Sequence, residues 1–185
     1  MKKLLISIFF YNGFIGFSCF TSSPSYALKS DQDQPIKLFS DNADFNDVTQ
    51  EYVLTGHAII IKGSLKVTGD KAVIVTDPEG FQKISVIAKA PNIATFSQQM
   101  DGPNHDLTDG QGELIIHEAK TDKLLISGNA IVKRLRGSVV KDLLISDQID
   151  YDLLTEKYIA SIKTPGKLVK STLAPRTPEK FKITD

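Results

Sequence analysis

The sequence predicts an all-β protein with little or no helix, folded as a sandwich or roll of short antiparallel strands. From Ile36 onward the chain repeats runs of about four to eight β-branched and apolar residues, each followed by Gly, Asp, Asn or Pro. About a dozen such runs recur at spacings near ten residues, which is typical of all-β sandwiches and rolls. No apolar period of 3.6 continues over about twelve residues, so helix is limited to a single turn.

The first residues predict an export signal rather than a part of the fold. Residues 1–3 are Met-Lys-Lys, residues 4–20 are mostly apolar, and Ser-Tyr-Ala at 25–27 places small residues before a cleavage point. We therefore expect a signal peptide over residues 1–27 that is cleaved after its last residue. The alternative is an uncleaved anchor helix, but the apolar run is shorter than the roughly 20 residues that span a bilayer and is interrupted at Asn12-Gly13.

Charge and cysteine content exclude several classes of protein. The 22 basic and 22 acidic residues give a net charge of +0, whereas nucleic-acid binding needs a surplus of Lys and Arg, so no nucleic-acid partner is expected. The single cysteine, Cys19, cannot close a disulfide within the chain and leaves with the leader. The exported chain is then cysteine-free and slightly acidic, and its core is built mainly from Ile, Val and Leu. An oxidising compartment suits such a chain.

The predicted strands begin after a polar lead-in, residues 28–35, which ends in Pro35. Each run is bounded by turn-forming residues. The runs predicted as strands are residues 36–40, 42–48, 51–61, 64–68, 71–76, 81–88, 93–98, 112–118, 123–134, 138–145, 148–153, 157–163 and 167–173.

Turn-forming residues predict how the strands connect. Asp77-Pro78-Glu79-Gly80 places Pro where φ is near −65° and Gly where φ is positive, so strands 71–76 and 81–88 should form a hairpin. Further chain reversals are predicted at Gly69-Asp70, Thr121-Asp122 and Pro165-Gly166. Asp101-Gly102-Pro103-Asn104 predicts a wide surface loop before Asp109–Gly112, where Gly110-Gln111-Gly112 is typical of a turn.

An internal repeat connects two distant strands. Residues 53–59 (Val-Leu-Thr-Gly-His-Ala-Ile) match residues 125–131 (Leu-Ile-Ser-Gly-Asn-Ala-Ile) in the order of apolar, hydroxyl, Gly, polar, Ala and Ile positions. Short polar corners, each expected to open a strand, recur at Ser40-Asp41, Gly69-Asp70 and Ser146-Asp147. Repeated strand-corner-strand units stack because a single unit cannot bury its apolar face. A purely local role of each glycine, relieving crowding at a bend, is the alternative.

No catalytic or metal site is predicted. His57, His105 and His117 lack a metal-binding spacing, the exported chain has no cysteine, and no Gly-x-Ser-x-Gly motif is present. Gly110-Gln111-Gly112 lacks the third glycine of a dinucleotide-binding loop. The acidic residues between positions 101 and 109 fit a solvated loop better than a catalytic carboxylate pair. We therefore expect no enzyme activity, no metal and no cofactor.

Several short motifs together carry a family resemblance. In chain order they are the leader, Asp33–Leu38, Ser40-Asp41, the Leu54–Ala58 box, Gly69–Ala72 and Ile126–Ala130. Each is weak alone, but their order and spacing resemble the OstA-like (LptA) family of periplasmic lipopolysaccharide-transport proteins, from about Asp33 to Leu173. The resemblance implies an open β-jellyroll domain over residues 28–173, in which about sixteen short strands form a V-shaped pair of sheets around an apolar groove. A flexible tail over residues 174–185 would follow.

The resemblance also implies a function and a set of lipid contacts. Members of the family carry lipopolysaccharide from the inner to the outer membrane and shield the acyl chains of lipid A. Exposing an acyl chain of roughly twelve carbons to water costs on the order of 10 kcal/mol, at about 0.8 kcal/mol per CH₂. The expected lipid contacts are Ile36 and Leu38 of the first strand, Phe96 in an Ala-Thr-Phe box and, by alternation, Ile115 and His117. For each, a sealed core position without lipid contact is the alternative.

By the same resemblance, the two ends of the roll are strand edges that pair with other chains by β-augmentation. The expected N-terminal edge is Ile36, Lys37, Leu38, Phe39 and Ser40, and the expected C-terminal edge is Lys167, Leu168, Val169, Lys170 and Ser171. The first edge would accept an LptC-like inner-membrane protein, and the second would meet an LptD-like outer-membrane translocon or the next copy of the chain. Head-to-tail contacts of this kind do not close, so filaments of variable length are expected. Edge lysines that only prevent pairing are the alternative.

Two other hypotheses compete with a soluble periplasmic bridge. A membrane-anchored LptC-like component of the same pathway would keep its N-terminal helix, so a mature N-terminus at Leu28 excludes it. A secreted β-sandwich glycan-binding module or enzyme would leave lipopolysaccharide traffic intact after depletion of the protein.

Overall fold

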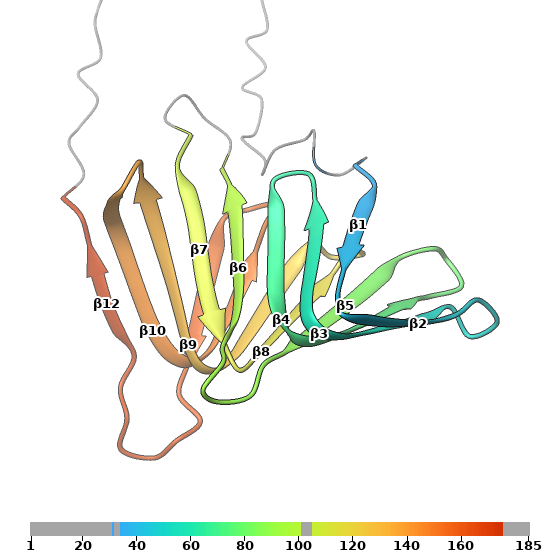
Figure 1. Cartoon of the computed structure of the whole chain (residues 1–185). Helices are drawn as coiled ribbons and strands as arrows, with labels where there is room; N and C mark the ends of the chain where they lie inside the picture. The colour runs from blue at the N-terminus through green and yellow to red at the C-terminus, as the bar shows by residue number, and fades with distance from the viewer. Residues whose placement is uncertain (1–30, 32–33, 101–104, 176–185) are drawn as a thin grey trace, which may run out of the picture.

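The computed structural model describes residues 31, 34–100 and 105–175, which form twelve strands in one continuous antiparallel sheet (Figure 1). The all-β prediction is confirmed for these residues. The strands are β1 (Ile36–Phe39), β2 (Asn42–Asn46), β3 (Glu51–Lys62), β4 (Leu65–Thr76), β5 (Gln82–Ile87), β6 (Ala94–Gln99), β7 (Leu107–Gly112), β8 (Leu114–Glu118), β9 (Lys123–Arg136), β10 (Val139–Asp152), β11 (Lys157–Ser161) and β12 (Lys170–Leu173).

Four long strands, β3, β4, β9 and β10, change neighbours halfway along their length. β4, for example, pairs with β6 through residues 66–68 and with β5 through residues 71–76. The bends divide the continuous sheet into two facing sheets that share the long strands. Sheet I contains β1, β6, β7 and β12 with one half of each long strand, and sheet II contains β2, β5, β8 and β11 with the other half. Each long strand thus contributes one half to each sheet, and the strands form the V-shaped pair of sheets that the family resemblance implies (Figure 1).

The internal repeat in the sequence marks two of these bends. Gly56-His57 in β3 and Gly128-Asn129 in β9 all have positive φ, between 45° and 78°. Gly adopts positive φ readily, and Asn and His do so more often than most other residues. The alanine that follows each pair, Ala58 or Ala130, is fully buried. The repeat is therefore the sequence of a corner at which a strand passes from one sheet to the other.

Two other predicted strand boundaries are also bends. Gly69-Asp70 does not reverse the chain, and neither it nor Ser146-Asp147 opens a new strand, so the sequence prediction is wrong at these points. Each pair lies in the middle of a single strand, β4 or β10, where the sequence predicts two. These polar pairs resemble loop residues in the sequence. In the structure they interrupt the pairing between strands only locally, because the strand continues in the second sheet.

Carboxylates on the outside of the bends accept hydrogen bonds from neighbouring loops. Asp70 accepts hydrogen bonds from the backbone N–H of Lys89 at 2.9 Å and from the side chain of Asn92 at 2.7 Å. Asp147 accepts one from the backbone N–H of Thr164 at 2.7 Å. The bonds from Lys89 and from Thr164 hold the pKa of Asp70 and of Asp147 below the usual range of a carboxyl group. Each bend is thereby attached to the loop that follows a neighbouring strand.

The two sheets approach closely along the bends, and small residues allow this approach. A Cβ added to Gly69 would lie 2.5 Å from Val86 Cγ1, and one added to Gly112 would lie 2.8 Å from Ile126 Cγ2. Fully buried alanines lie beside the bends at Ala58, Ala72 and Ala130. Gly and Ala residues therefore line the closed side of the V, where the two sheets meet.

Residues 107–112 form strand β7, whereas the sequence predicts a loop and a turn there. The prediction is wrong because Gly110 and Gly112 occupy buried positions of a strand that pairs with β6 and β9. Gly110 lies opposite Phe96 of β6, and an added Cβ would overlap the Phe96 ring. The ring thus fills the place of the missing side chain, as aromatic residues do beside glycines in sheets. Of the predicted loop, residues 101–104 lie outside the described residues.

The other turn predictions agree with the structure. β4 and β5 form the predicted hairpin around Asp77–Gly80, where Gly80 has a φ of 90°. Asp77 Oδ1 accepts hydrogen bonds from the backbone N–H groups of Glu79 and Phe81 at 2.9 and 2.8 Å. Thr121-Asp122 connects the antiparallel pair β8 and β9, and Pro165-Gly166 lies between β11 and β12. The predicted signal peptide and residues 176–185 of the predicted tail lie outside the described residues.

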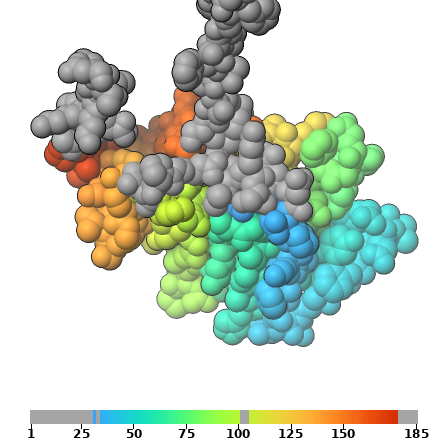
Figure 2. Space-filling model, turned by 90° about the horizontal axis from the view of Figure 1, so that it is seen from above, coloured from blue at the N-terminus to red at the C-terminus, as the bar shows by residue number. Residues whose placement is uncertain are grey.

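The first and last strands lie at opposite ends of the molecule. The N-terminal strands, blue and cyan, and the C-terminal strands, orange and red, are separated by the central strands (Figures 1 and 2). β1 and β2 border the N-terminal end of sheets I and II, and β12 and β11 border the C-terminal end. Each end of the roll therefore presents two strand edges.

Candidate functional site

The facing surfaces of the two sheets form an apolar interior. In β6 every second residue is buried, and the same alternation continues in β7 and β8. The fully buried apolar side chains include Leu54, Ile60, Val67, Ile74, Val86, Phe96, Ile115, Leu124, Ile126, Ile149 and Tyr151. These side chains offer few hydrogen-bonding groups, so the interior is suited to apolar contacts without fixed direction.

A row of aromatic rings crosses the interior between the two sheets. The Phe96 ring of sheet I stacks on Tyr151 of sheet II at a centroid distance of 6.4 Å, and Tyr151 stacks on Tyr158 of β11 at 4.2 Å. Burial raises the pKa of both tyrosine hydroxyls, so both stay protonated over the physiological range. The row extends from the sealed centre toward the C-terminal end of the roll.

The five predicted lipid contacts all face this interior, but at different depths. Phe96, Ile115 and His117 are at most 3% exposed and belong to its centre. Ile36 and Leu38 are half-buried at the N-terminal end, where they pack against the core. Their intervening neighbours in the strand, Lys37 and Phe39, are exposed. Of the five, Ile36 and Leu38 are therefore the most accessible from outside.

His117 is a polar residue in this apolar environment. Its Nε2 lies 3.4 Å from Asp122 Oδ1, which is a long hydrogen bond, and its buried Nδ1 has no hydrogen-bond partner among the described residues. Ile84 and Leu124 lie beside it in the neighbouring strands. The side chain is thus directed inward, as alternation predicts.

The C-terminal end of the interior holds a pocket of about 420 Å³ between sheets I and II. Its apolar walls come from β9, β10, β11 and β12, and the lining includes Met100, Val132, Leu144, Tyr158 and Leu173. No pattern in the sequence indicates this pocket. Alternation in β10 would assign Leu144 to the inner face, but the pocket depends on β11 and β12 lying on opposite sheets, which the sequence does not indicate.

An ion network borders this pocket. Asp106, which is 7% exposed, accepts hydrogen bonds from Arg136 Nε at 2.8 Å and from Arg134 Nη1 at 3.3 Å. Arg134 Nε also donates to Asp142 at 2.7 Å. The hydrogen bond from Arg136 holds the pKa of Asp106 below its usual range. The network attaches the start of β7 to the ends of β9 and β10, beside the pocket mouth.

The predicted partner edges lie at the two ends of the roll. Residues 36–39 are β1, which pairs with β3 on one side. Residues 170–171 belong to β12, which pairs with β10, and residues 167–169 precede this strand. The sequence prediction omits β2 and β11, which border sheet II at the same two ends. The sequence predicts both as strands, at residues 42–48 and 157–163, but nothing in it indicates that these strands lie at an edge of the sheet.

The described residues contain no group of three or more His, Cys, Asp or Glu side chains that could hold a metal ion. Within the same residues, the structure has no helix with the length and apolar character to cross a membrane. The site that the geometry offers is therefore the apolar interior, its pocket and the strand edges.

The structure defines the class of protein as an open β-roll of two sheets, with an apolar interior, a pocket at one end of this interior and strand edges at both ends. Comparison with known proteins then identifies the family. A family model described as the LptA/(LptD N-terminal domain) LPS transport protein matches residues 37–157. The chain belongs to this family of lipopolysaccharide transport proteins, as the sequence resemblance predicts.

Individual relatives agree with this assignment. The lipopolysaccharide export system protein LptA of Escherichia coli K12 is 30% identical over 154 residues, which cover 83% of this chain and 78% of that protein. LptA of Haemophilus influenzae is 26% identical over 159 residues, covering 84% of this chain and 91% of that protein. The crystal structure of LptH from Pseudomonas aeruginosa, a periplasmic LptA homologue, superposes with a TM-score of 0.68. At 22% identity, over 79% of this chain and 99% of the LptH chain, it shows that the fold is shared.

Proposed function

We propose that this protein is an exported periplasmic bridge that holds the acyl chains of lipopolysaccharide in the interior of its roll and passes them toward the outer membrane. The observation that carries the proposal is the apolar interior with its C-terminal pocket, found in a chain of the lipopolysaccharide transport family. The relatives named LptA are lipopolysaccharide export system proteins, and the LptH neighbour is described as periplasmic.

Burial of the acyl chains supplies the binding energy in this proposal. Each buried CH₂ contributes about 0.8 kcal/mol, so even partial burial of one acyl chain offsets much of its exposure to water. Apolar contacts have no fixed direction, so neighbouring positions along the interior have similar free energy, and a lipid can move between them. Net direction then comes from an energy source outside this chain, in the family an inner-membrane ATPase complex.

Lipid passage requires the packed centre of the interior to widen. The centre is packed by Phe96, Ile115 and Tyr151, whereas Ile36, Leu38 and the C-terminal pocket are partly open. We expect acyl chains to enter beside Ile36 and Leu38 and to displace side chains of the centre as they advance. The stacked rings of Tyr151 and Tyr158 would then form one wall of the path.

The strand edges connect the bridge to its partners. In the proposal, β1 and β2 accept an LptC-like inner-membrane protein or the preceding copy, and β11 and β12 meet the next copy or an LptD-like translocon. The exposed side chains of sheet II support head-to-tail order, because β2 and its turn carry Asp44 and Asp47 whereas β11 carries Lys157. Opposite charges at the two ends favour this order over head-to-head pairing.

Binding of purified lipopolysaccharide to single-residue variants tests the proposal. Leu144 faces the interior pocket, and Ile145, the next residue of β10, lies on the outer face of sheet I. Leu144→Asp should reduce lipopolysaccharide binding at least about tenfold, because a charge in the pocket must be desolvated beside an acyl chain. Ile145→Asp is the matched control and should bind normally. Equal binding by both variants, with both folded by circular dichroism, would exclude the interior as the lipid site.

A further inference from the structure

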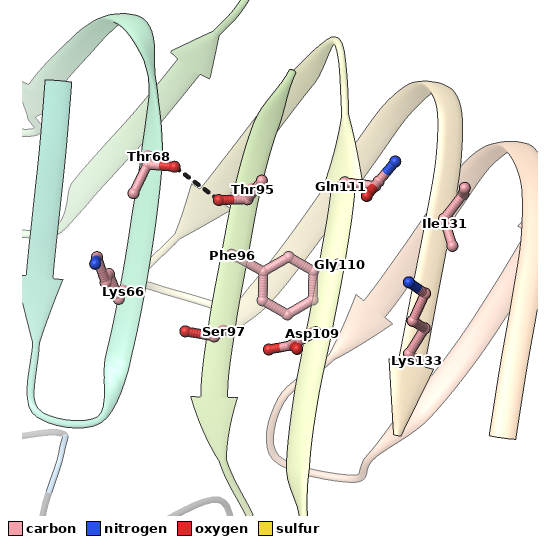
Figure 3. A pocket seen from close by; sticks show the side chains of 10 residues that line it. All are labelled: Lys66, Thr68, Thr95, Phe96, Ser97, Asp109, Gly110, Gln111, Ile131 and Lys133. Carbon is pink, nitrogen blue, oxygen red and sulfur yellow. Dashed lines mark hydrogen bonds between the residues drawn. The ribbon is translucent and has the colours of Figure 1, made fainter. Parts of the chain in front are cut away.

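The outer face of sheet I has a hollow of about 380 Å³ on the side away from the interior, lined by polar side chains together with Phe96, Gly110 and Ile131 (Figure 3). Two rows of side chains cross the strands β4, β6, β7 and β9 there. The first row is Lys66, Ser97, Asp109 and Lys133, and the second is Thr68, Thr95, Gln111 and Ile131. We call this surface the outer hollow. Its volume lies within the range of small-molecule sites.

The shape of the outer hollow follows from the sizes of these side chains. The middle strand β6 contributes the short residues Thr95 and Ser97, while Lys66 and Lys133 rise on the two sides (Figure 3). Thr68 Oγ1 and Thr95 Oγ1 lie 2.7 Å apart, so a hydrogen bond fixes two hydroxyls of the floor. The result is a floor of hydroxyl groups between two cationic walls.

The two lysines of the outer hollow form no ion pair with another part of the described protein, although Lys133 lies beside Asp109 on the neighbouring strand. Lys83, Lys120 and Lys167 form ion pairs elsewhere on the surface. By contrast, no ion pair among the described residues involves Lys66 or Lys133. Asp109 stands between them, and burial raises its pKa although Lys133 acts in the opposite direction. A partly desolvated carboxylate of this kind accepts hydrogen bonds from hydroxyl donors strongly.

We propose that the outer hollow binds an anionic saccharide group, such as a phosphorylated sugar. Lys66 and Lys133 would neutralise the anionic group as point charges. Asp109 and Gln111 would accept and donate hydrogen bonds to sugar hydroxyls, and Thr95 and Ser97 would line the floor. In the cell the ligand would be the sugar-phosphate headgroup of lipopolysaccharide, and this last assignment rests on the proposed function.

The test is an NMR titration of the processed, isotope-labelled protein with glucose 6-phosphate, inorganic phosphate and glucose in separate arms. Glucose 6-phosphate should shift the amides of β6 and β7 with a dissociation constant of about 0.3 mM, as expected for a ligand of its size. Inorganic phosphate and glucose should each bind at least about tenfold more weakly, because each offers half of the contacts. Equal binding of inorganic phosphate would reduce the hollow to a simple anion site and overturn the proposal.

Three variants make the titration specific. K66Q/K133Q should weaken binding of glucose 6-phosphate about tenfold or more, whereas K71Q, on the sheet II half of the same strand, should not. D109N should reduce the preference for glucose 6-phosphate over inorganic phosphate, because the sugar loses its carboxylate acceptor. Unchanged affinity in K66Q/K133Q would overturn the proposal.

The proposed function can be judged separately with the same proteins. Leu144→Asp should lose lipopolysaccharide binding in the interior and keep glucose 6-phosphate binding in the outer hollow. If lipopolysaccharide binds normally to wild type but glucose 6-phosphate shifts no amide of β6 or β7, the outer hollow is refuted and the interior site is not.

Discussion

Phe96 shows how one side chain can determine the packing of two strands. Its ring lies over Gly110 of β7, is fully buried and stacks on Tyr151 across the interior. The Ala-Thr-Phe motif predicts that Phe96 points inward. The role of Gly110 could not be predicted, because glycine in Asp-Gly-Gln-Gly is typical of turns and its opposite neighbour is known only from the strand pairing.

Gly110→Ala tests this packing. The added Cβ overlaps the Phe96 ring, so the ring must move or β7 must shift. We expect the free energy of unfolding to fall by about 1–3 kcal/mol, the usual cost of overpacking. Gln111→Ala, the next residue on the outer face of the same strand, should change it by less than about 0.5 kcal/mol. Urea unfolding followed by circular dichroism measures both, and equal stability of the two variants would refute the packing role.

Asp106 predicts a dependence of stability on pH. Its pKa in the folded chain lies below the value of about 3.9 for an unfolded chain, because Arg136 donates hydrogen bonds to the carboxylate. A carboxyl group with a lowered folded-state pKa stabilises the fold above about pH 4 and loses this contribution as the pH falls through the folded-state value. The sequence pattern around Asp106 predicts a solvated loop, because the arginine partners of this residue are distant in the chain.

Asp106→Asn should therefore lower the free energy of unfolding at pH 7 and flatten its decline between about pH 4 and pH 2. The exposed Asp44→Asn is the matched control and should follow the wild-type curve more closely. Urea unfolding at several pH values provides the measurement. A wild-type pH dependence in Asp106→Asn would show that the network does not contribute.

At the scale of elements, the strands were more predictable than their connections. Short alternating runs place β1, β3, β5, β6 and β8 close to their observed bounds. The polar corners in β4 and β10 predict breaks, because a Gly-Asp or Ser-Asp pair is the same locally whether the chain turns back or bends into a second sheet. Which of the two occurs depends on pairing with strands far away in the sequence, such as β6 with β4. The apolar pocket depends on the same long-range pairing.

The strand edges predict association of the protein with itself. If β2 meets β11 in head-to-tail order, the acidic edge of one copy of sheet II faces the basic edge of the next. We expect sedimentation velocity to show larger species as the protein concentration rises, and smaller ones as salt screens the charges. Lys157→Glu, which places a like charge opposite Asp44 and Asp47, should weaken association several-fold.

The matched control is Lys71→Glu, an exposed residue of β4, which pairs with β3 and β5 and is at neither edge of sheet II. It should associate as wild type does. If Lys71→Glu and the edge variant weaken association equally, net charge rather than edge pairing governs it.

At the scale of the whole molecule, the fold separates two kinds of surface. The interior is apolar and continuous between the two sheets, and the outer face of sheet I is polar over β4, β6 and β7. A chain with a formal net charge of +0 can hold an apolar ligand inside while local lysines meet anionic groups outside. This separation is the physical basis of the proposed transport of an amphiphile.

The central claim is that lipopolysaccharide acyl chains lie inside the roll. Photo-crosslinking in cells tests it most directly, with a photoreactive amino acid placed in turn at four successive positions of β1. Ile36 and Leu38 face the interior, whereas Lys37 and Phe39 are exposed, so the strand provides its own controls. If acyl chains lie in the interior, we expect lipopolysaccharide adducts from positions 36 and 38 and few or none from 37 and 39. Equal adducts from all four positions, or adducts from 37 and 39 alone, would contradict it.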